Sequence, residues 1–135
     1  KDALINLLES AKDELCVVVG YCLRRAGQSA NKSGKTTVFK LGGNYDPTNA
    51  FTAKELQESE RIKIRIRGTG LGCALIPKQV FEKITFPWFK WVVYNDKSKL
   101  SEDLFFCSKC REAKIPMYVD TRVNCGHMMR YIENI

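Results

Sequence analysis

The sequence predicts an α/β domain in which a mixed, mostly parallel β-sheet is flanked by helices. Residues 15–19, Leu-Cys-Val-Val-Val, form a continuous apolar run, which is typical of a strand covered on both faces, as in a mostly parallel sheet. Apolar residues recur at helical spacing on either side of this run, in residues 2–12 and 101–113. With 135 residues and 44% hydrophobic content, the chain is expected to form one domain spanning residues 1–135.

The first half of the chain alternates helix, strand and loop. Residues 2–12 are predicted to be an amphipathic helix, because four apolar side chains fall on one side: Leu4, Leu7, Leu8 and Ala11. The strand at 15–19 continues to a basic end at residues 24–25. Residues 26–37 are polar and are predicted to be a loop. Thr52 and Glu55 form a capping-box pattern, which predicts a short helix to about residue 59.

Residues 61–67 alternate strictly, with isoleucines at 62, 64 and 66 on one face and basic side chains on the other. This pattern predicts a half-buried strand. Its basic face has two interpretations, namely solvation with protection of a sheet edge, or a surface for an anionic ligand. Three glycines follow, at positions 68, 70 and 72, and let the backbone turn tightly or approach a ligand. Pro77 fits the first turn of a helix that ends near Ile84.

The last helix is predicted over residues 101–113, with Ser101 as its N-cap. Its apolar arc contains Phe106, Cys107, Cys110 and Ala113. Asp103 falls in the middle of this arc and Glu102 at its edge. A carboxylate aimed inward at a helix start is a candidate acid or base. The alternative is that both acids only complement the helix dipole. Two short strand-like pieces then lead to Cys125-Gly126-His127.

Six cysteines, at 16, 22, 73, 107, 110 and 125, lie mostly inside apolar patterns. We therefore expect reduced, buried thiols in a cytoplasmic protein, although the even number also permits disulfides. The spacing Cys107-x2-Cys110, fourteen residues, Cys125-x-His127 has a second interpretation as a zinc site. Against it, zinc cysteines usually lie on turns, whereas this pair lies on a helix face that needs small buried residues.

The net charge of +7 and pI near 9.2 suit an anionic partner, such as a nucleotide diphosphate, nucleic acid or an acidic membrane surface. No apolar run approaches the roughly 20 residues of a membrane-spanning helix, so no transmembrane segment is expected. The N-terminus lacks the pattern of an export signal.

The stretch S-E-D-L-F-F-C-S-K-C-R-E-A, followed by M-Y-V-D and C-G-H, resembles the C-terminal signature of GT-A-type, inverting, nucleotide-sugar-dependent glycosyltransferases of family-2 type. The segments D-A-L-I-N-L-L and V-V-G-Y-C-L-R-R are similar to the helix and strand that follow the family's Asp-x-Asp metal motif. The resemblance thus covers nearly the whole chain and corresponds to the acceptor-side half of the fold. The donor-binding half and its Asp-x-Asp motif would lie before residue 1, so the chain reads as a GT-A-like fold truncated on its N-terminal side.

The resemblance also implies roles for individual residues. Asp103 would be the general base that deprotonates the acceptor hydroxyl, supported by Glu102, and His127 would be a ligand of a divalent metal, Mn²⁺ or Mg²⁺. The segment Gly70-Leu71-Gly72, before A-L-I-P-K, is similar to the family's loop at the junction of donor and acceptor sites; the alternative is a purely structural turn. Trp88, in the aromatic cluster at 86–91, is a candidate acceptor contact, and its alternative role is core packing.

The function implied is inverting transfer of a sugar from a nucleotide-sugar donor to a sugar, lipid or protein acceptor. The site is expected to need its donor-binding half, or a second chain or copy that completes it. Two other classes stay open. One is a non-catalytic binding module of the same fold. The other is a small zinc-bound domain that binds nucleic acid, although nucleic acid is not the partner the resemblance implies.

Overall fold

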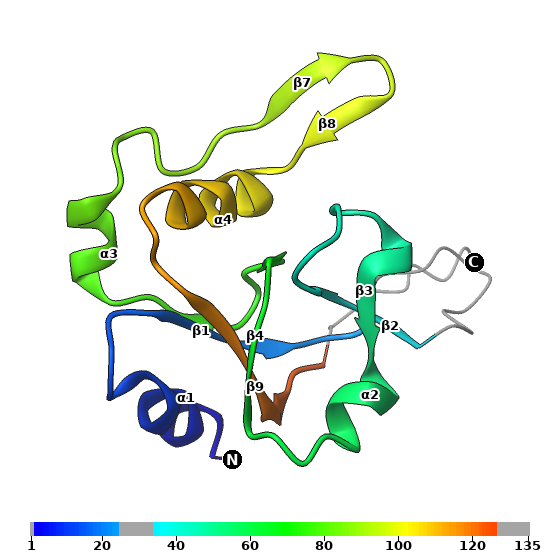
Figure 1. Ribbon diagram of the computed structural model, residues 1–135, viewed down its shortest axis with the longest axis vertical. Helices are drawn as coiled ribbons and strands as arrows, with labels where there is room; N and C mark the ends of the chain where they lie inside the picture. The colour runs from blue at the N-terminus through cyan, green and yellow to red at the C-terminus, as the bar shows by residue number, and fades with distance from the viewer. Residues whose placement is uncertain (1, 25–33, 127–135) are drawn as a thin grey trace, which may run out of the picture.

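A computed structural model describes residues 2–24 and 34–126 of the chain. Its main sheet has four strands in the order β4-β9-β1-β6. The two central strands, β1 (Val17–Tyr21) and β9 (Met117–Asn124), run parallel. β4 (Lys63–Arg65) pairs with β9 and β6 (Ala74–Leu75) pairs with β1, both antiparallel. Figure 1 shows β1 and β9 crossing the middle of the molecule.

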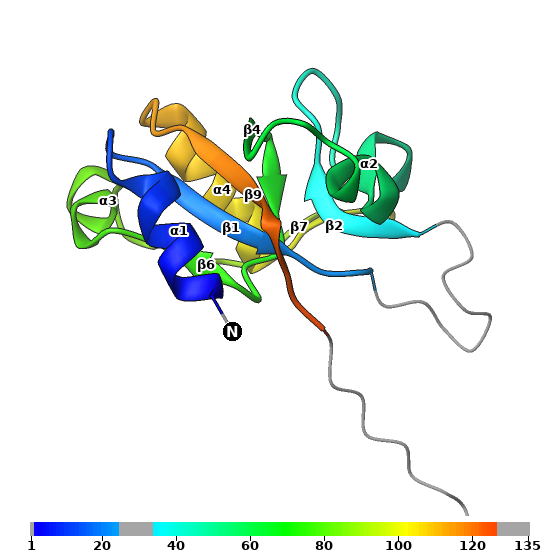
Figure 2. The ribbon, with the colours of Figure 1, turned by 90° about the horizontal axis from the view of Figure 1, so that it is seen from below.

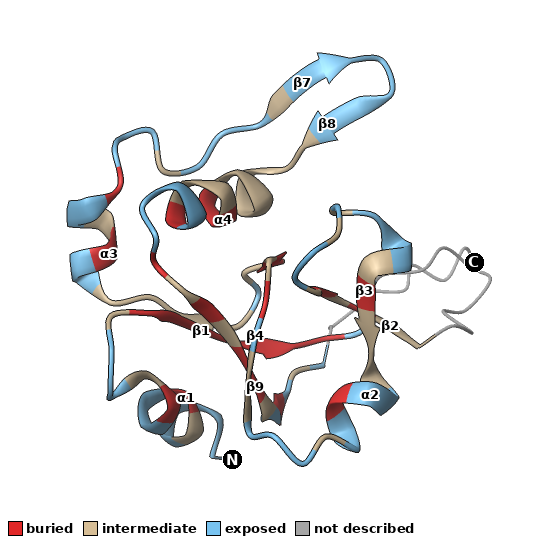
Figure 3. Cartoon of the chain, viewed as in Figure 1, coloured by how far each residue is buried: buried red, intermediate tan, exposed pale blue. Residues whose placement is uncertain are grey.

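A second, smaller sheet has the order β3-β2-β5, formed by β2 (Lys35–Phe39), β3 (Ala50–Thr52) and β5 (Gly68–Thr69), all antiparallel. The loop predicted for residues 26–37 is therefore wrong at residues 35–37, which begin β2. A third pair, β7 (Val92–Asn95) and β8 (Ser98–Leu100), forms a hairpin that stands out from the body of the fold. Most of this hairpin is exposed (Figure 3).

The prediction of an α/β fold with a mixed sheet is confirmed, but the prediction of a mostly parallel sheet is wrong. Among the described residues, β1 and β9 are the one parallel pair, and the other strand pairs are antiparallel. The apolar run at 15–19 indicated correctly that β1 is buried on both faces, because all five of its residues are buried. Burial on both faces follows from helices on both sides of the sheet and does not fix the direction of the neighbouring strands.

The two helices that cover β1 and β9 lie on opposite sides of the sheet, with α1 (Ala3–Ala11) on one side and α4 (Glu102–Glu112) on the other (Figures 1 and 2). Alternate residues of β1 therefore enter two separate cores. Val17, Val19 and Tyr21 join Phe106 in the larger core, while Val18 joins Leu7 of α1 in the smaller one.

The shorter helices follow the predicted signals. Both hydrogen bonds of the predicted capping box are present between Thr52 and Glu55, at the start of α2 (Ala53–Gln57). Pro77 is the N-cap of α3 (Lys78–Lys83), one residue before the predicted first turn. A single turn of 3₁₀ helix (Pro47–Asn49) precedes β3. The two short strand-like pieces predicted after residue 114 are one continuous strand, β9.

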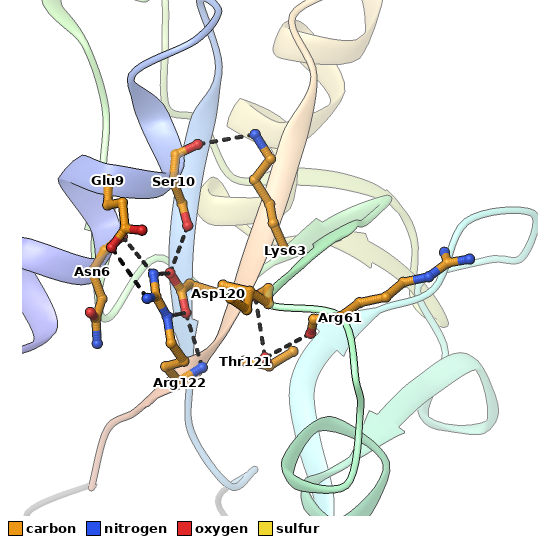
Figure 4. Close-up of polar contacts among 9 residues, drawn as sticks. Asn6, Glu9, Ser10, Arg61, Lys63, Asp120, Thr121 and Arg122 are labelled. Atoms are coloured by element: carbon orange, nitrogen blue, oxygen red, sulfur yellow. Dashed lines mark hydrogen bonds and ion pairs between the residues drawn. The ribbon is translucent and has the colours of Figure 1, made fainter.

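A buried carboxylate, Asp120 on β9, ties the sheet to α1 (Figure 4). Its Oδ2 accepts hydrogen bonds from Ser10 Oγ at 2.7 Å and from an Arg122 guanidinium nitrogen at 2.9 Å, and its Oδ1 accepts from Arg122 Nε at 3.1 Å. Arg122 also contacts Glu9 of α1 at 3.3 Å. Burial alone raises the pKa of Asp120, but the hydrogen bonds and charge of Arg122 and the hydrogen bond from Ser10 outweigh it, so its pKa lies below the ordinary value.

Candidate active site

Asp103 is positioned by the first turn of α4. The Oγ of Ser101 accepts a hydrogen bond from the N–H of Leu104 at 3.4 Å, which makes Ser101 the N-cap, as predicted. The carboxylate of Asp103 then lies at the positive end of the helix dipole. Its Oδ2 accepts a hydrogen bond from the backbone N–H of Leu71 at 3.1 Å. Leu71 and Asp103 are 32 residues apart, and each belongs to a segment predicted from the sequence to form part of the site. The hydrogen bond brings these two segments into contact.

A cavity of about 130 Å³ opens beside this contact. Its walls come from β2, from the segment after β5 and from the start of α4. The lining residues are Arg24, Thr37, Phe39, Gly70, Ser101, Asp103 and Leu104. Among the residues that the structure describes, no group hydrogen-bonds the Oδ1 of Asp103. Within this part of the chain, the carboxylate is thus held through one oxygen, Oδ2.

The three predicted glycines differ in their surroundings. A Cβ on Gly68 would lie 2.7 Å from a ring carbon of Tyr45 and 3.2 Å from Cys107 of α4, so the close approach of the Tyr45 ring requires glycine here. A Cβ on Gly70 would lie 3.7 Å from Asp103 Oδ2, which is ordinary contact distance at the wall of the cavity. Gly72 is exposed, and no atom of the described residues lies within 4 Å of a Cβ placed there.

Leu71 contributes its backbone N–H to the site, while its side chain packs against the larger core. Glu102 does not line the cavity with Asp103. Its Oε2 is buried and has no hydrogen-bond partner among the described residues. The two neighbouring acids therefore point to different surroundings, and Asp103 is the one that faces the cavity.

Trp88 lies elsewhere. Its ring packs edge-on against Phe81 at 5.0 Å, and its Nε1 donates a hydrogen bond to the carbonyl of Ile84 at 3.3 Å. It borders a shallow apolar hollow with Phe81 and Phe89, and it is absent from the lining of the Asp103 cavity. Residues 86–91 form no strand.

The cysteines of the zinc hypothesis are not brought together. Cys107 and Cys110 lie in the larger core, whereas Cys125 packs against the smaller core on the other side of the sheet. Burial raises the pKa of both Cys107 and Cys110 to about 12, and the charge of Asp103 adds to the rise at Cys107. All six thiols are free; Cys73 and Cys125 are half-buried, and the other four are buried.

The predicted metal ligand His127 lies outside the described residues. Within residues 2–24 and 34–126, no group of three or more His, Cys, Asp or Glu side chains could hold a metal ion. No helix in this part of the chain is both long and apolar enough to cross a membrane.

Four residues that line the cavity were not predicted from the sequence, namely Arg24, Thr37, Phe39 and Leu104. The available signal for β2 was the run of β-branched and aromatic residues from Thr36 to Phe39, which favour strands, but the polar composition of residues 26–37 obscured where the strand begins. Phe39 is buried and Thr37 half-buried.

Comparison of the chain with protein-family models, with curated proteins and with solved structures gives no match. The function must therefore be argued from the cavity and from the resemblance in the sequence.

Proposed function

We propose that this domain is the acceptor-side part of an inverting, GT-A-like glycosyltransferase in which Asp103 is the general base. The observation that carries the proposal is the hydrogen bond of 3.1 Å between Asp103 Oδ2 and the Leu71 N–H. The resemblance assigned the base to the acidic helix and the substrate loop to Gly70-Leu71-Gly72. Residues of both segments line one cavity, which supports a site in which the base and the substrate loop act together.

The chemistry needs a carboxylate with one oxygen fixed and one oxygen accessible. The Leu71 N–H holds the Oδ2 of Asp103, which leaves Oδ1 to accept a hydrogen bond from an acceptor hydroxyl within about 2.6–3.2 Å. As the acceptor oxygen bonds to the anomeric carbon, its proton passes to Asp103 and the bond from that carbon to the diphosphate breaks. Attack from the face opposite the leaving group inverts the anomeric centre.

A divalent metal, when bound, would stabilise the charge of the departing diphosphate. The residue predicted to ligate it, His127, is outside the described residues, and no step above depends on it. Glu102 does not line the cavity, and its buried Oε2 has no hydrogen-bond partner in the part of the chain that the structure describes. A supporting role for Glu102 therefore stays a prediction, as does the acceptor contact of Trp88.

Binding of a donor is tested by thermal denaturation with UDP-, GDP-, ADP- and TDP-sugars, with and without Mn²⁺. A ligand that binds only the folded state raises the melting temperature with the logarithm of its concentration. A manganese-dependent rise with one nucleotide sugar would show that this chain holds a donor site, and we then expect inversion at the anomeric carbon when the product is analysed by proton NMR. A product that retains the donor configuration would contradict the proposal. The absence of any rise would mean that this chain alone has no donor site and acts as a half-domain or binding module.

A further inference from the structure

A second cavity, of about 100 Å³, lies below the C-terminal end of α4. Four cationic side chains line it: Arg65, Arg67, Arg111 and Lys114. The rest of its lining is apolar or thiol, from Leu41, Ile66, Cys107, Ile115, Pro116 and Met117. It shares no lining residue with the Asp103 cavity. It is therefore a separate site, and nothing in the proposed transfer reaction uses it.

The four positive charges around this cavity are not neutralised by acidic residues in its lining. No acidic residue lines it, and within the described part of the chain none of the four cations forms an ion pair with a carboxylate. The C-terminus of α4 offers a partial negative charge equivalent to about half an elementary charge, which offsets only a fraction of the four positive ones. Like charges held around one small space repel each other, and an anion placed between them relieves this repulsion.

The basic face predicted for residues 61–67 is divided by the fold. Lys63 turns toward α1, where its ammonium donates to the Ser10 carbonyl at 3.0 Å and lies 4.4 Å from the centre of the Tyr118 ring. Arg65 and Arg67 instead line the cavity. Solvation alone would not gather these two arginines with two more cations from a different element.

Arg67 has a buried hydrogen-bond donor, its Nε, that has no acceptor among the described residues. Its guanidinium lies over the ring of Tyr45 at 5.1 Å, and its backbone N–H donates to the carbonyl of Phe39 at 3.0 Å, so its position is fixed. Its Nε is nevertheless buried without a hydrogen-bond partner among residues 2–24 and 34–126. A buried charged donor without an acceptor destabilises the fold, and such a group calls for an explanation such as a bound ion.

Lys114 occupies a backbone position that normally favours glycine. Its φ of 58° is in the left-handed region, immediately after the helix end at Ala113. The N–H of Lys114 donates to the Arg111 carbonyl and the N–H of Ile115 to the Cys110 carbonyl, the pattern of a Schellman C-cap. A lysine here bears conformational strain that glycine would avoid, and it adds a charge to the cavity.

We propose that this cavity binds a phosphoryl group of a small molecule. A guanidinium fork matches the oxygens of a phosphate and donates two parallel hydrogen bonds, and three of the four cations here are arginines. A volume of about 100 Å³ admits one such group rather than a whole nucleotide. The source is either free phosphate or diphosphate, or the terminal phosphate of a larger metabolite.

Isothermal titration calorimetry with inorganic phosphate, at constant ionic strength set with chloride, tests the proposal. We expect one saturable site in the unmodified chain. Arg67→Gln and Arg111→Gln should each weaken binding roughly ten- to a hundredfold, because each removes charged hydrogen bonds. Arg61→Gln is the matched control, since it removes the same charge from an exposed residue of the same segment that does not line the cavity. Diphosphate and a nucleoside monophosphate, titrated separately, distinguish the two sources.

Lys114→Gln provides a second variant at an exposed position, where folding is not at risk. It should also weaken phosphate binding while the melting temperature without phosphate is maintained. The proposal is overturned if the unmodified chain shows no saturable phosphate binding above the chloride background. Equal loss of affinity in Arg61→Gln and the cavity variants would also overturn it, because the effect would then be one of net charge alone.

Discussion

The Asp120 network offers a quantitative test of what holds α1 to the sheet. Asp120→Asn keeps the size of the side chain but replaces one acceptor oxygen with a donor that faces Arg122 or Ser10. Breaking one partner of a buried ion pair costs about 3–5 kcal/mol. Because the Arg122 side chain is 31% exposed, water screens part of this loss. We therefore expect the free energy of unfolding to fall by about 2–3 kcal/mol.

Urea denaturation at pH 7, followed by circular dichroism, measures this difference, and a domain of this size should lose about 4 °C of melting temperature per kcal/mol. Asp96→Asn is the control, since Asp96 is an exposed acid in the turn of the β7–β8 hairpin. A change below about 0.5 kcal/mol in Asp120→Asn, within the range of ordinary surface substitutions, would refute the reasoning.

The same network predicts a dependence on pH. The pKa of Asp120 is lower in the folded state than its ordinary value of 3.8. Its contribution is therefore complete above about pH 5 and is lost as the pH falls through the folded pKa. The difference in stability between the unmodified chain and Asp120→Asn should stay constant from pH 7 to pH 5 and shrink below about pH 4. A difference that grows on acidification would contradict this assignment.

Three further predictions follow from local geometry. Lys114→Gly should raise the free energy of unfolding by about 0.5–1 kcal/mol, since glycine relieves the left-handed backbone, and a loss in urea denaturation would contradict this. Gly68→Ala should lower it by about 1–3 kcal/mol because its Cβ would meet Tyr45 at 2.7 Å, whereas Gly72→Ala should change it by less than about 0.5 kcal/mol. Cys107, with a pKa near 12, should resist alkylation at pH 8 until the protein is unfolded, as read by peptide mass spectrometry.

The start of α4 shows what local sequence can determine. Ser101 as the cap, the acids in the first turn and the burial of Phe106, Cys107 and Cys110 all follow from hydrogen bonding and helical periodicity within a dozen residues. The directions of the strands beside β1 depend on how distant segments return to the sheet, and no local pattern encodes that. The mostly parallel sheet was therefore predicted wrongly even though the burial of β1 was predicted correctly.

In the candidate site, too, single residues could be predicted from the sequence, whereas the contacts between distant segments could not. Asp103 could be selected because a carboxylate in an apolar arc is unusual, but its contact with Leu71 joins segments that only the fold brings together. Cys107 and Cys125 show the converse, because metal-like spacing in the sequence gave no indication that the sheet would separate them. The cationic cavity was foreseeable only as a basic face, since two of its four charges come from the end of α4.

The most direct test of the proposed function is the rate of sugar transfer in Asp103→Asn, with Asp96→Asn as the matched control. The asparagine can still accept the Leu71 hydrogen bond, so the fold and the binding of the nucleotide sugar should be unchanged. Loss of a general base should reduce the rate by about 10²–10⁴-fold, while the control keeps its activity. Transfer by Asp103→Asn at the rate of the unmodified chain would contradict the assignment of Asp103 as the base.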